Sequence, residues 1–134
     1  MVVTTTTYDS EKHCHIIHEP SKTRIETDAP KDNQGKGESF SPTDLMGAAL
    51  GACILTTMAI LCEKEGLSLS GTTAHVFKEM ASNPRRISKL AVKISFAQKV
   101  PTQLREKIER IAHTCPVHKS LNPEIDAPIE FVYS

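Results

Sequence analysis

Cysteine is the residue type in this chain with the greatest capacity for chemistry, and it occurs at positions 14, 53, 62 and 115. The first ten residues are polar and threonine-rich, without the basic and apolar segments of a secretory signal, so we expect a cytoplasmic protein. In a reducing compartment, cysteines are more often free, catalytic or metal-binding than joined in structural disulfides.

Cys115 has the most favourable local sequence for reactivity. Pro116 suits the first position of a new helix, which makes Cys115 the predicted N-cap, where backbone N–H groups favour a thiolate. A helix terminus contributes only about 0.3–1 kcal/mol, so nearby cations would have to help. The candidates are His113, His118 and Lys119. The alternative is an unreactive loop cysteine.

Cys53 lies in the middle of the longest apolar run, where a helical backbone offers its sulfur no donor. A free cysteine in that setting is most often a small buried core residue. Cys62 follows nine residues later and half a turn round, so it cannot pair with Cys53 on one helix and is predicted to be core. Cys14, in a predicted strand, has no partner that spacing identifies.

The histidines raise the question of a metal site. One cluster contains Cys14 and three histidines, and another surrounds Cys115; the histidines are His13, His15, His18, His113 and His118. Neither cluster contains the C-x₂-C pair that accompanies H-x₃₋₅-H in a structural zinc site. His13 and His15 would share a strand face and could supply two ligands, but we predict no metal and no other cofactor.

The element that must position Cys53 is a helix over 41–66. Ser41 can cap it, Pro42 suits its first position, and Asp44 completes the spacing of a capping box. Gly66 offers the left-handed conformation that ends a helix. The start and the end of this helix are therefore both encoded locally.

No charged residue occurs from Leu45 to Cys62, so the predicted helix is apolar on every face and must be covered all round. A transmembrane span is the alternative, since about 18 uncharged residues approach the length needed to cross a bilayer. The run is diluted by Gly, Ala and Thr and has no basic flank or aromatic belt, which favours a buried central helix and no membrane. The core is aliphatic, with 4% aromatic residues and no Trp. We therefore expect a second copy to cover part of the helix in a homodimer.

The length and the net charge of the chain limit the number of domains and the kinds of partner. Its 134 residues fit a single domain over 1–134. Sixteen basic and sixteen acidic residues give zero formal net charge. A nucleic-acid-binding protein usually has an excess of basic residues, so we predict no nucleic-acid partner.

The remaining pattern predicts an α+β fold with helices packed on antiparallel sheet. Residues 3–8, continued at 14–17, and residues 23–27 have strand composition and form an amino-terminal hairpin, followed by a loop over 28–40. Two more strands, 69–80 and 86–96, meet at a turn over 82–84. A helix opens at Pro101, a short one starts at Pro116, and a strand covers 129–133.

Two segments resemble the OsmC/Ohr family of thiol-dependent hydroperoxide reductases. They are SPTDLMGAALGACILTTMAI, which contains Cys53, and the later CPVHKSL, which begins at Cys115. In that family a Pro-led helix carries the peroxidatic cysteine, and a Cys-Pro pair far downstream supplies the resolving cysteine. The order of elements agrees over nearly the whole chain, and the DAP…G…G loop before the helix is similar to the OsmC-like branch.

The resemblance implies an intertwined homodimer, with antiparallel sheets wrapped around long central helices and active sites at the subunit interface. It also implies that the Cys53 thiolate attacks an organic hydroperoxide, releases an alcohol and becomes a sulfenic acid. Cys115 then condenses with it to a disulfide, and an external dithiol, such as a lipoylated protein, restores both thiols. No metal or bound organic cofactor takes part.

The chain departs from the classical branch, which has a Glu ten residues before the peroxidatic cysteine. That position is Thr43 here, with Asp44 beside it. Asp44 either replaces the Glu or only caps the helix. About 13 Å of straight helix and half a turn separate Asp44 from Cys53, so it could reach only the cysteine of a partner chain.

The helper arginine of the family aligns with no motif here, and Arg24 is the candidate; otherwise it is an exposed strand residue. Without an arginine nearby, a buried Cys53 would have a raised pKa and react poorly. The local sequence thus favours Cys115 as the thiolate, whereas the resemblance assigns the attack to Cys53, which we follow. The alternative functions are a low-activity relative that binds a small apolar ligand at the dimer interface, and a metal-binding protein.

Overall fold

The computed structural model describes all 134 residues, which form two compact units, Met1–Met46 and Gly47–Ser134. Each unit is described by itself. The expectation that residues 1–134 act as one domain stays a prediction.

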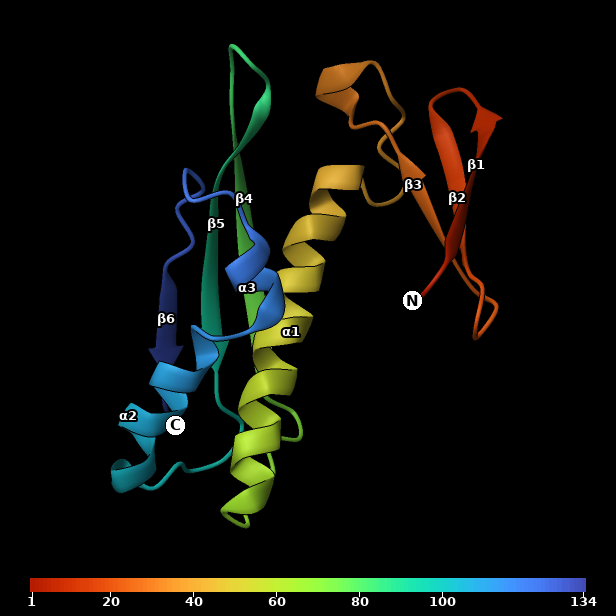
Figure 1. Cartoon of the computed structure of the whole chain (residues 1–134). Helices are drawn as coiled ribbons and strands as arrows, with labels where there is room; N and C mark the ends of the chain where they lie inside the picture. The colour runs from red at the N-terminus through yellow and green to blue at the C-terminus, as the bar shows by residue number, and fades with distance from the viewer. The chain divides into compact units, whose positions relative to one another are not determined.

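The first unit contains a three-stranded antiparallel sheet, with strands β1 (Thr4–Ser10), β2 (His13–His18) and β3 (Thr23–Asp28) in that order (Figure 1). The sequence predicted one hairpin, so the turn between β1 and β2 was missed. Its central residues, Glu11 and Lys12, have φ values of 52° and 61°. Tight turns with two left-handed residues usually carry Gly or Asn, and the pair Glu-Lys gives no such signal.

The segment after β3 is a loop, as predicted, with one short 3₁₀ turn, η1 (Lys31–Asn33). It folds back on the end of β3, because the Asp28 N–H donates to the Phe40 carbonyl over 2.9 Å. Gly35 permits a close approach of the backbone, since a Cβ there would lie 1.8 Å from the Ala29 carbonyl oxygen.

Helix α1 (Pro42–Lys64) begins at the predicted capping box. The Asp44 N–H donates to Ser41 Oγ over 3.0 Å, and the Ser41 N–H donates to Asp44 Oδ2 over 2.9 Å. At the other end Gly66 has a φ of 75°, and the Leu67 N–H donates to the Cys62 carbonyl over 2.8 Å. Both ends of the predicted helix are therefore confirmed.

One stripe of α1 is buried within the chain, formed by Gly47, Leu50, Gly51, Ile54, Met58 and Cys62. Apolar residues on other faces stay exposed: Met46 is 42% exposed and Ile60 is 55% exposed. The all-round cover that the sequence predicts is thus not supplied by this chain alone. By length and composition α1 could also cross a membrane, a criterion that the core helix of a soluble protein meets as well.

The second unit packs α1 on a three-stranded sheet of β4 (Thr73–Ala81), β5 (Arg86–Ser95) and β6 (Ile129–Val132), with β5 in the centre (Figure 1). Strands β4 and β5 form the predicted antiparallel hairpin, although β4 starts later than expected. Strand β6 runs parallel to β5, because the connection between them contains helices α2 (Thr102–Ala112) and α3 (Pro116–Ser120). The α+β class is confirmed.

Helix α1 approaches the sheet closely through two glycines one turn apart. A Cβ at Gly51 would lie 3.1 Å from Val76 Cγ2, and one at Gly47 would lie 3.6 Å from Leu90 Cδ2. The apolar face predicted for β5 is buried, including Leu90 and Ile94 at 0% exposure. This packing fixes the half of α1 that carries Cys53.

An aromatic cluster joins the end of the chain to α2. The rings of Tyr133 and Phe96 stack with centroids 4.7 Å apart, and the Arg105 guanidinium lies 4.2 Å from the Tyr133 ring centroid. The Tyr133 hydroxyl donates to the Glu109 carboxylate over 2.6 Å. Burial and this carboxylate raise the pKa of Tyr133. The cluster holds α2 beside the C-terminal strand, just before the segment that carries Cys115.

Candidate thiol site

Cys115 is the N-cap of α3, as its sequence predicts. Its backbone is extended, Pro116 follows at the start of the helix, and Cys115 Sγ accepts a hydrogen bond from the His118 N–H over 3.2 Å. The thiol is fully buried. Local sequence therefore predicted the cap position of this sulfur and a backbone N–H as its donor, although it did not identify that donor as His118.

The backbone N–H groups at that position favour the Cys115 thiolate, as predicted, but burial outweighs them. Burial raises the pKa of Cys115 most strongly, because it removes the water that would solvate the thiolate. The His118 and Val117 N–H groups lower it, whereas the hydrogen bond and charge of the Cys53 thiol raise it again. The net direction is upward, because a cap contributes less than full burial costs.

Cys53 lies in the middle of α1, half-buried and packed against the core of the second unit. Its thiol lies close enough to that of Cys115 to hydrogen-bond with it. Spacing alone gave no reason to join these residues; the family resemblance did. The fold thus brings together the two cysteines that the resemblance pairs, one from α1 and one from the cap of α3, and both are reduced. Their individual roles stay predictions.

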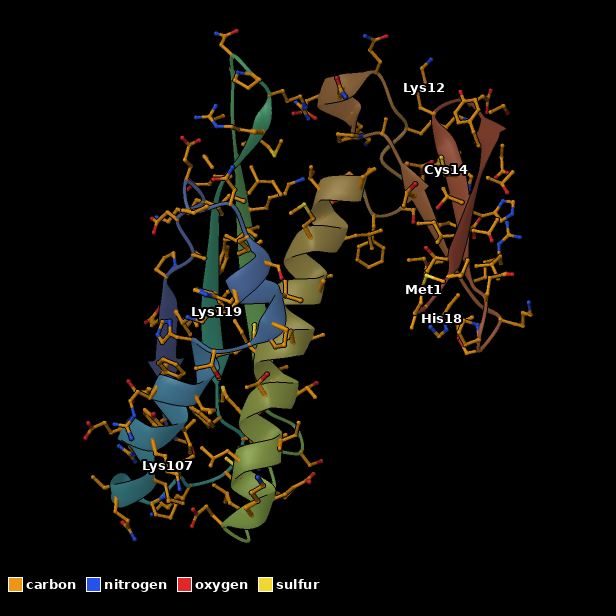
Figure 2. All side chains as sticks on the ribbon, viewed as in Figure 1. Met1, Lys12, Cys14, His18, Lys107 and Lys119 are labelled. Carbon is orange, nitrogen blue, oxygen red and sulfur yellow. The ribbon has the colours of Figure 1, made fainter.

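The other two cysteines lie elsewhere. Cys62 is buried in the core, as predicted, and burial together with Glu65 raises its pKa. Cys14 is half-buried in β2 of the first unit, opposite Tyr8 on β1 and Thr27 on β3 (Figure 2). Both serve as internal controls for the chemistry of Cys53.

Asp44 and Arg24 belong to the first unit, and neither role predicted for them beside Cys53 is tested by the geometry. The Asp44 carboxylate accepts from the Ser41 N–H, which is the helix-capping alternative. The Arg24 guanidinium is exposed and lies 3.3 Å from the Glu26 carboxylate, two residues along β3. Their participation in catalysis stays a prediction.

The histidines of β2 pair with carboxylates. His13 Nδ1 lies 2.6 Å from Asp28 and its Nε2 lies 3.0 Å from Glu26. His15 Nδ1 lies 2.9 Å from Asp9. The chain contains no group of three or more His, Cys, Asp or Glu side chains placed to hold a metal ion.

The pair of His13 and Asp28 predicts a pH-dependent stability. Asp28 raises the pKa of His13 above its usual 6.5, and His13 lowers the pKa of Asp28 below its usual 3.8. The His13 contribution is complete below about pH 6.5 and is lost as pH rises through the raised folded pKa; that of Asp28 is lost as pH falls through its lowered folded pKa. We expect His13→Gln to lower the free energy of unfolding more at about pH 5.5 than at about pH 8.5.

Urea unfolding of both proteins at the two pH values measures this difference. The control is His75→Gln, which replaces an exposed histidine on β4. An equal effect of His13→Gln at both pH values would contradict the expected ion pair.

A pocket of about 500 Å³ lies beside the helix that Cys115 caps. Its walls include His113 and His118, whose rings meet edge to face with centroids 5.7 Å apart, and the segment 121–128. Sequence reasoning named both histidines as possible cationic helpers of Cys115. The structure shows His118 helping through its backbone N–H instead. His118 is the third residue of α3, and the N–H at that position commonly donates to the side chain of the N-cap residue. The position of His118 relative to Cys115 could therefore have predicted this hydrogen bond.

Comparison with known proteins identifies relatives of this chain. A family model described as OsmC-like protein matches residues 35–130. A search of curated proteins finds no match.

Several solved structures share the fold. A candidate osmotic stress-induced and detoxification response protein of Psychrobacter arcticus is 40% identical, with a TM-score of 0.94 over 98% of this chain and 96% of that one. An organic hydroperoxide resistance protein of Legionella pneumophila is 14% identical, with a TM-score of 0.79 over 98% of this chain and 96% of that one. OhrB of Bacillus subtilis, another organic hydroperoxide resistance protein, is 14% identical, with a TM-score of 0.68 over 98% of this chain and 97% of that one.

Proposed function

This chain belongs to the OsmC/Ohr family, and we propose that it reduces organic hydroperoxides to alcohols by means of Cys53 and Cys115. The family is linked to organic hydroperoxide resistance and oxidative stress. The observation that carries the proposal is the contact between the two thiols, contributed by elements far apart in the sequence.

In the proposed cycle the Cys53 thiolate attacks the distal oxygen of the peroxide bond. The alkoxide leaves and takes up a proton to become the alcohol, and Cys53 becomes a sulfenic acid. Cys115 then attacks the sulfenic sulfur, which forms the disulfide and releases water. Cys53 is suited to the first step because it is half-buried, whereas Cys115 is fully buried.

An external dithiol completes the cycle by reducing the disulfide, and a lipoylated protein is the candidate that family resemblance suggests. We propose a cytoplasmic homodimer in which the second copy covers the exposed apolar face of α1. Its exposed residues include Met46 and Ile60. The candidate helpers of Cys53 are Arg24 and, through the partner chain, Asp44.

The proposal is tested by the intact mass of fully reduced protein after one equivalent of cumene hydroperoxide. We expect a loss of about 2 Da within seconds, mapped by peptides to a bond between Cys53 and Cys115. Cys62→Ala should behave identically, because Cys62 lies in the core away from the pair. An unchanged mass, or slow oxidation spread over Cys14 and Cys62, would replace this function by the ligand-binding alternative.

A further inference from the structure

Tyr133 connects helix α2 to the sheet through both its ring and its hydroxyl. The ring stacks on Phe96, the first residue after β5, with centroids 4.7 Å apart. The Arg105 guanidinium of α2 lies 4.2 Å from the centroid of the same ring, and the Tyr133 hydroxyl donates to the Glu109 carboxylate over 2.6 Å. Arg105 and Glu109 are one turn apart on α2, so a single side chain beside the end of β6 holds two positions on one ridge of the helix.

The two charged residues that contact Tyr133 differ in exposure from the rest of α2. Arg105 and Glu109 are half-buried. The other charged side chains of this helix are exposed; they are Glu106, Lys107 and Arg110. Burial and the Glu109 carboxylate raise the pKa of Tyr133, so its hydroxyl keeps its proton and remains a donor at neutral pH.

The ridge that Tyr133 holds leads directly to Cys115. It ends at Ala112, the last residue of α2, which is fully buried. The turn that follows is fixed to the helix, because the N–H and the hydroxyl of Thr114 both donate to the Ile111 carbonyl, over 2.9 Å and 2.7 Å. Cys115 is the next residue, so its position relative to the sheet depends on how α2 is held.

The sheet of the second unit is the common frame for the two thiols. Helix α1, which carries Cys53, packs on β4 and β5 through Gly47 and Gly51. Helix α2, which leads to Cys115, is held beside the ends of β5 and β6 by Tyr133. All these contacts lie within one chain, so they do not depend on whether a second copy covers the exposed face of α1. Contacts on both helices therefore affect the distance between the two sulfurs.

Resting on the proposed function, we propose that Tyr133 is a positioning residue for the step in which Cys115 forms the disulfide. Its hydroxyl acts through Glu109 and α2. In that step the Cys115 thiolate attacks the sulfenic sulfur of Cys53, the S–S bond forms and the S–O bond breaks. The departing hydroxide takes up the proton that Cys115 released, which gives water. Alignment raises the effective concentration of two reacting groups, so loss of the Tyr133 hydroxyl should lower it.

The test is the equilibrium between the Cys53–Cys115 disulfide and its two thiols in glutathione redox buffers, in a Cys14→Ala/Cys62→Ala background. Each protein disulfide that forms converts one glutathione disulfide into two glutathione thiols, so the equilibrium constant gives the effective concentration of the pair. Tyr133→Phe keeps the ring and removes only the hydroxyl. We expect it to lower the effective concentration at least about fivefold. An equal loss of stability in the reduced and oxidised proteins cancels in this equilibrium, so a hydroxyl with only a structural role would leave it unchanged.

Tyr8→Phe is the matched control, because it removes the other tyrosine hydroxyl of the chain, which accepts from the Lys12 N–H in the first unit. It should leave the effective concentration unchanged. Glu109→Ala should lower it by a factor similar to that of Tyr133→Phe. The double variant should lower it no further, since the two side chains act through one hydrogen bond.

Three outcomes would overturn the inference. They are a Tyr133→Phe protein that matches Tyr8→Phe, losses for Tyr133→Phe and Glu109→Ala that add in the double variant, and a background protein that forms no disulfide in these buffers. Glutathione forms the bond without peroxide, so the result does not depend on hydroperoxide reduction. A protein that ignores cumene hydroperoxide but shows the Tyr133 effect would overturn the proposed function and leave the placement of Cys115 by Tyr133 standing.

Discussion

Cys53→Ser is expected to reduce the rate of hydroperoxide consumption by at least about a thousandfold. A serine hydroxyl is not ionised at neutral pH, so it does not attack a peroxide bond as a thiolate does. Cys115 remains in this variant, but its thiol is fully buried and burial raises its pKa. The measurement is the initial rate of loss of cumene hydroperoxide in the presence of excess dithiothreitol.

Two further variants serve as controls for Cys53→Ser. Cys14→Ala should retain most of the activity, because Cys14 lies in β2 of the first unit. Without added thiol, Cys115→Ser should consume about one equivalent of peroxide and gain about 16 Da on Cys53, since a sulfenic acid without its partner cysteine cannot form the disulfide. A Cys53→Ser protein that still turns over at a substantial rate would exclude Cys53 as the peroxidatic residue.

The sequence predicted best what depends on neighbours along the chain. The capping box of Ser41 and Asp44, the stop at Gly66 and the cap at Cys115 all follow from residues within one turn of each other. The turn at Glu11 and Lys12 was missed because its left-handed residues are not the usual ones. Local signals therefore locate elements when the residue type matches the conformation.

Properties that depend on the folded environment could not be obtained in this way. The cap of Cys115 and the direction in which its backbone donors act were predicted correctly, but the burial that outweighs these donors and raises the pKa of the thiol was not. The contact between Cys53 and Cys115 follows no spacing rule, because it depends on how α3 packs beside α1. Only resemblance to a family supplied that pairing from the sequence.

Among the substitutions considered, the largest loss of stability is expected where α1 packs on the central strand β5. Leu90 is fully buried on the central strand β5, and its Cδ2 lies 3.6 Å from the place a Cβ would take on Gly47 of α1. Leu90→Ala removes apolar contacts and leaves a cavity that the close-packed glycine face of the helix cannot fill. We expect the free energy of unfolding to fall by about 2–5 kcal/mol.

Urea unfolding at one fixed protein concentration measures this loss, because a dimer would make apparent stability depend on concentration. Lys93→Ala is the matched control: it lies on the same strand with an exposed side chain and should change stability by less than about 0.5 kcal/mol. The Leu90 variant should also form the Cys53–Cys115 disulfide more slowly, since looser packing of α1 on the sheet leaves the two thiols less well aligned. A loss similar to that of Lys93→Ala would show that the sheet does not hold α1 through this contact.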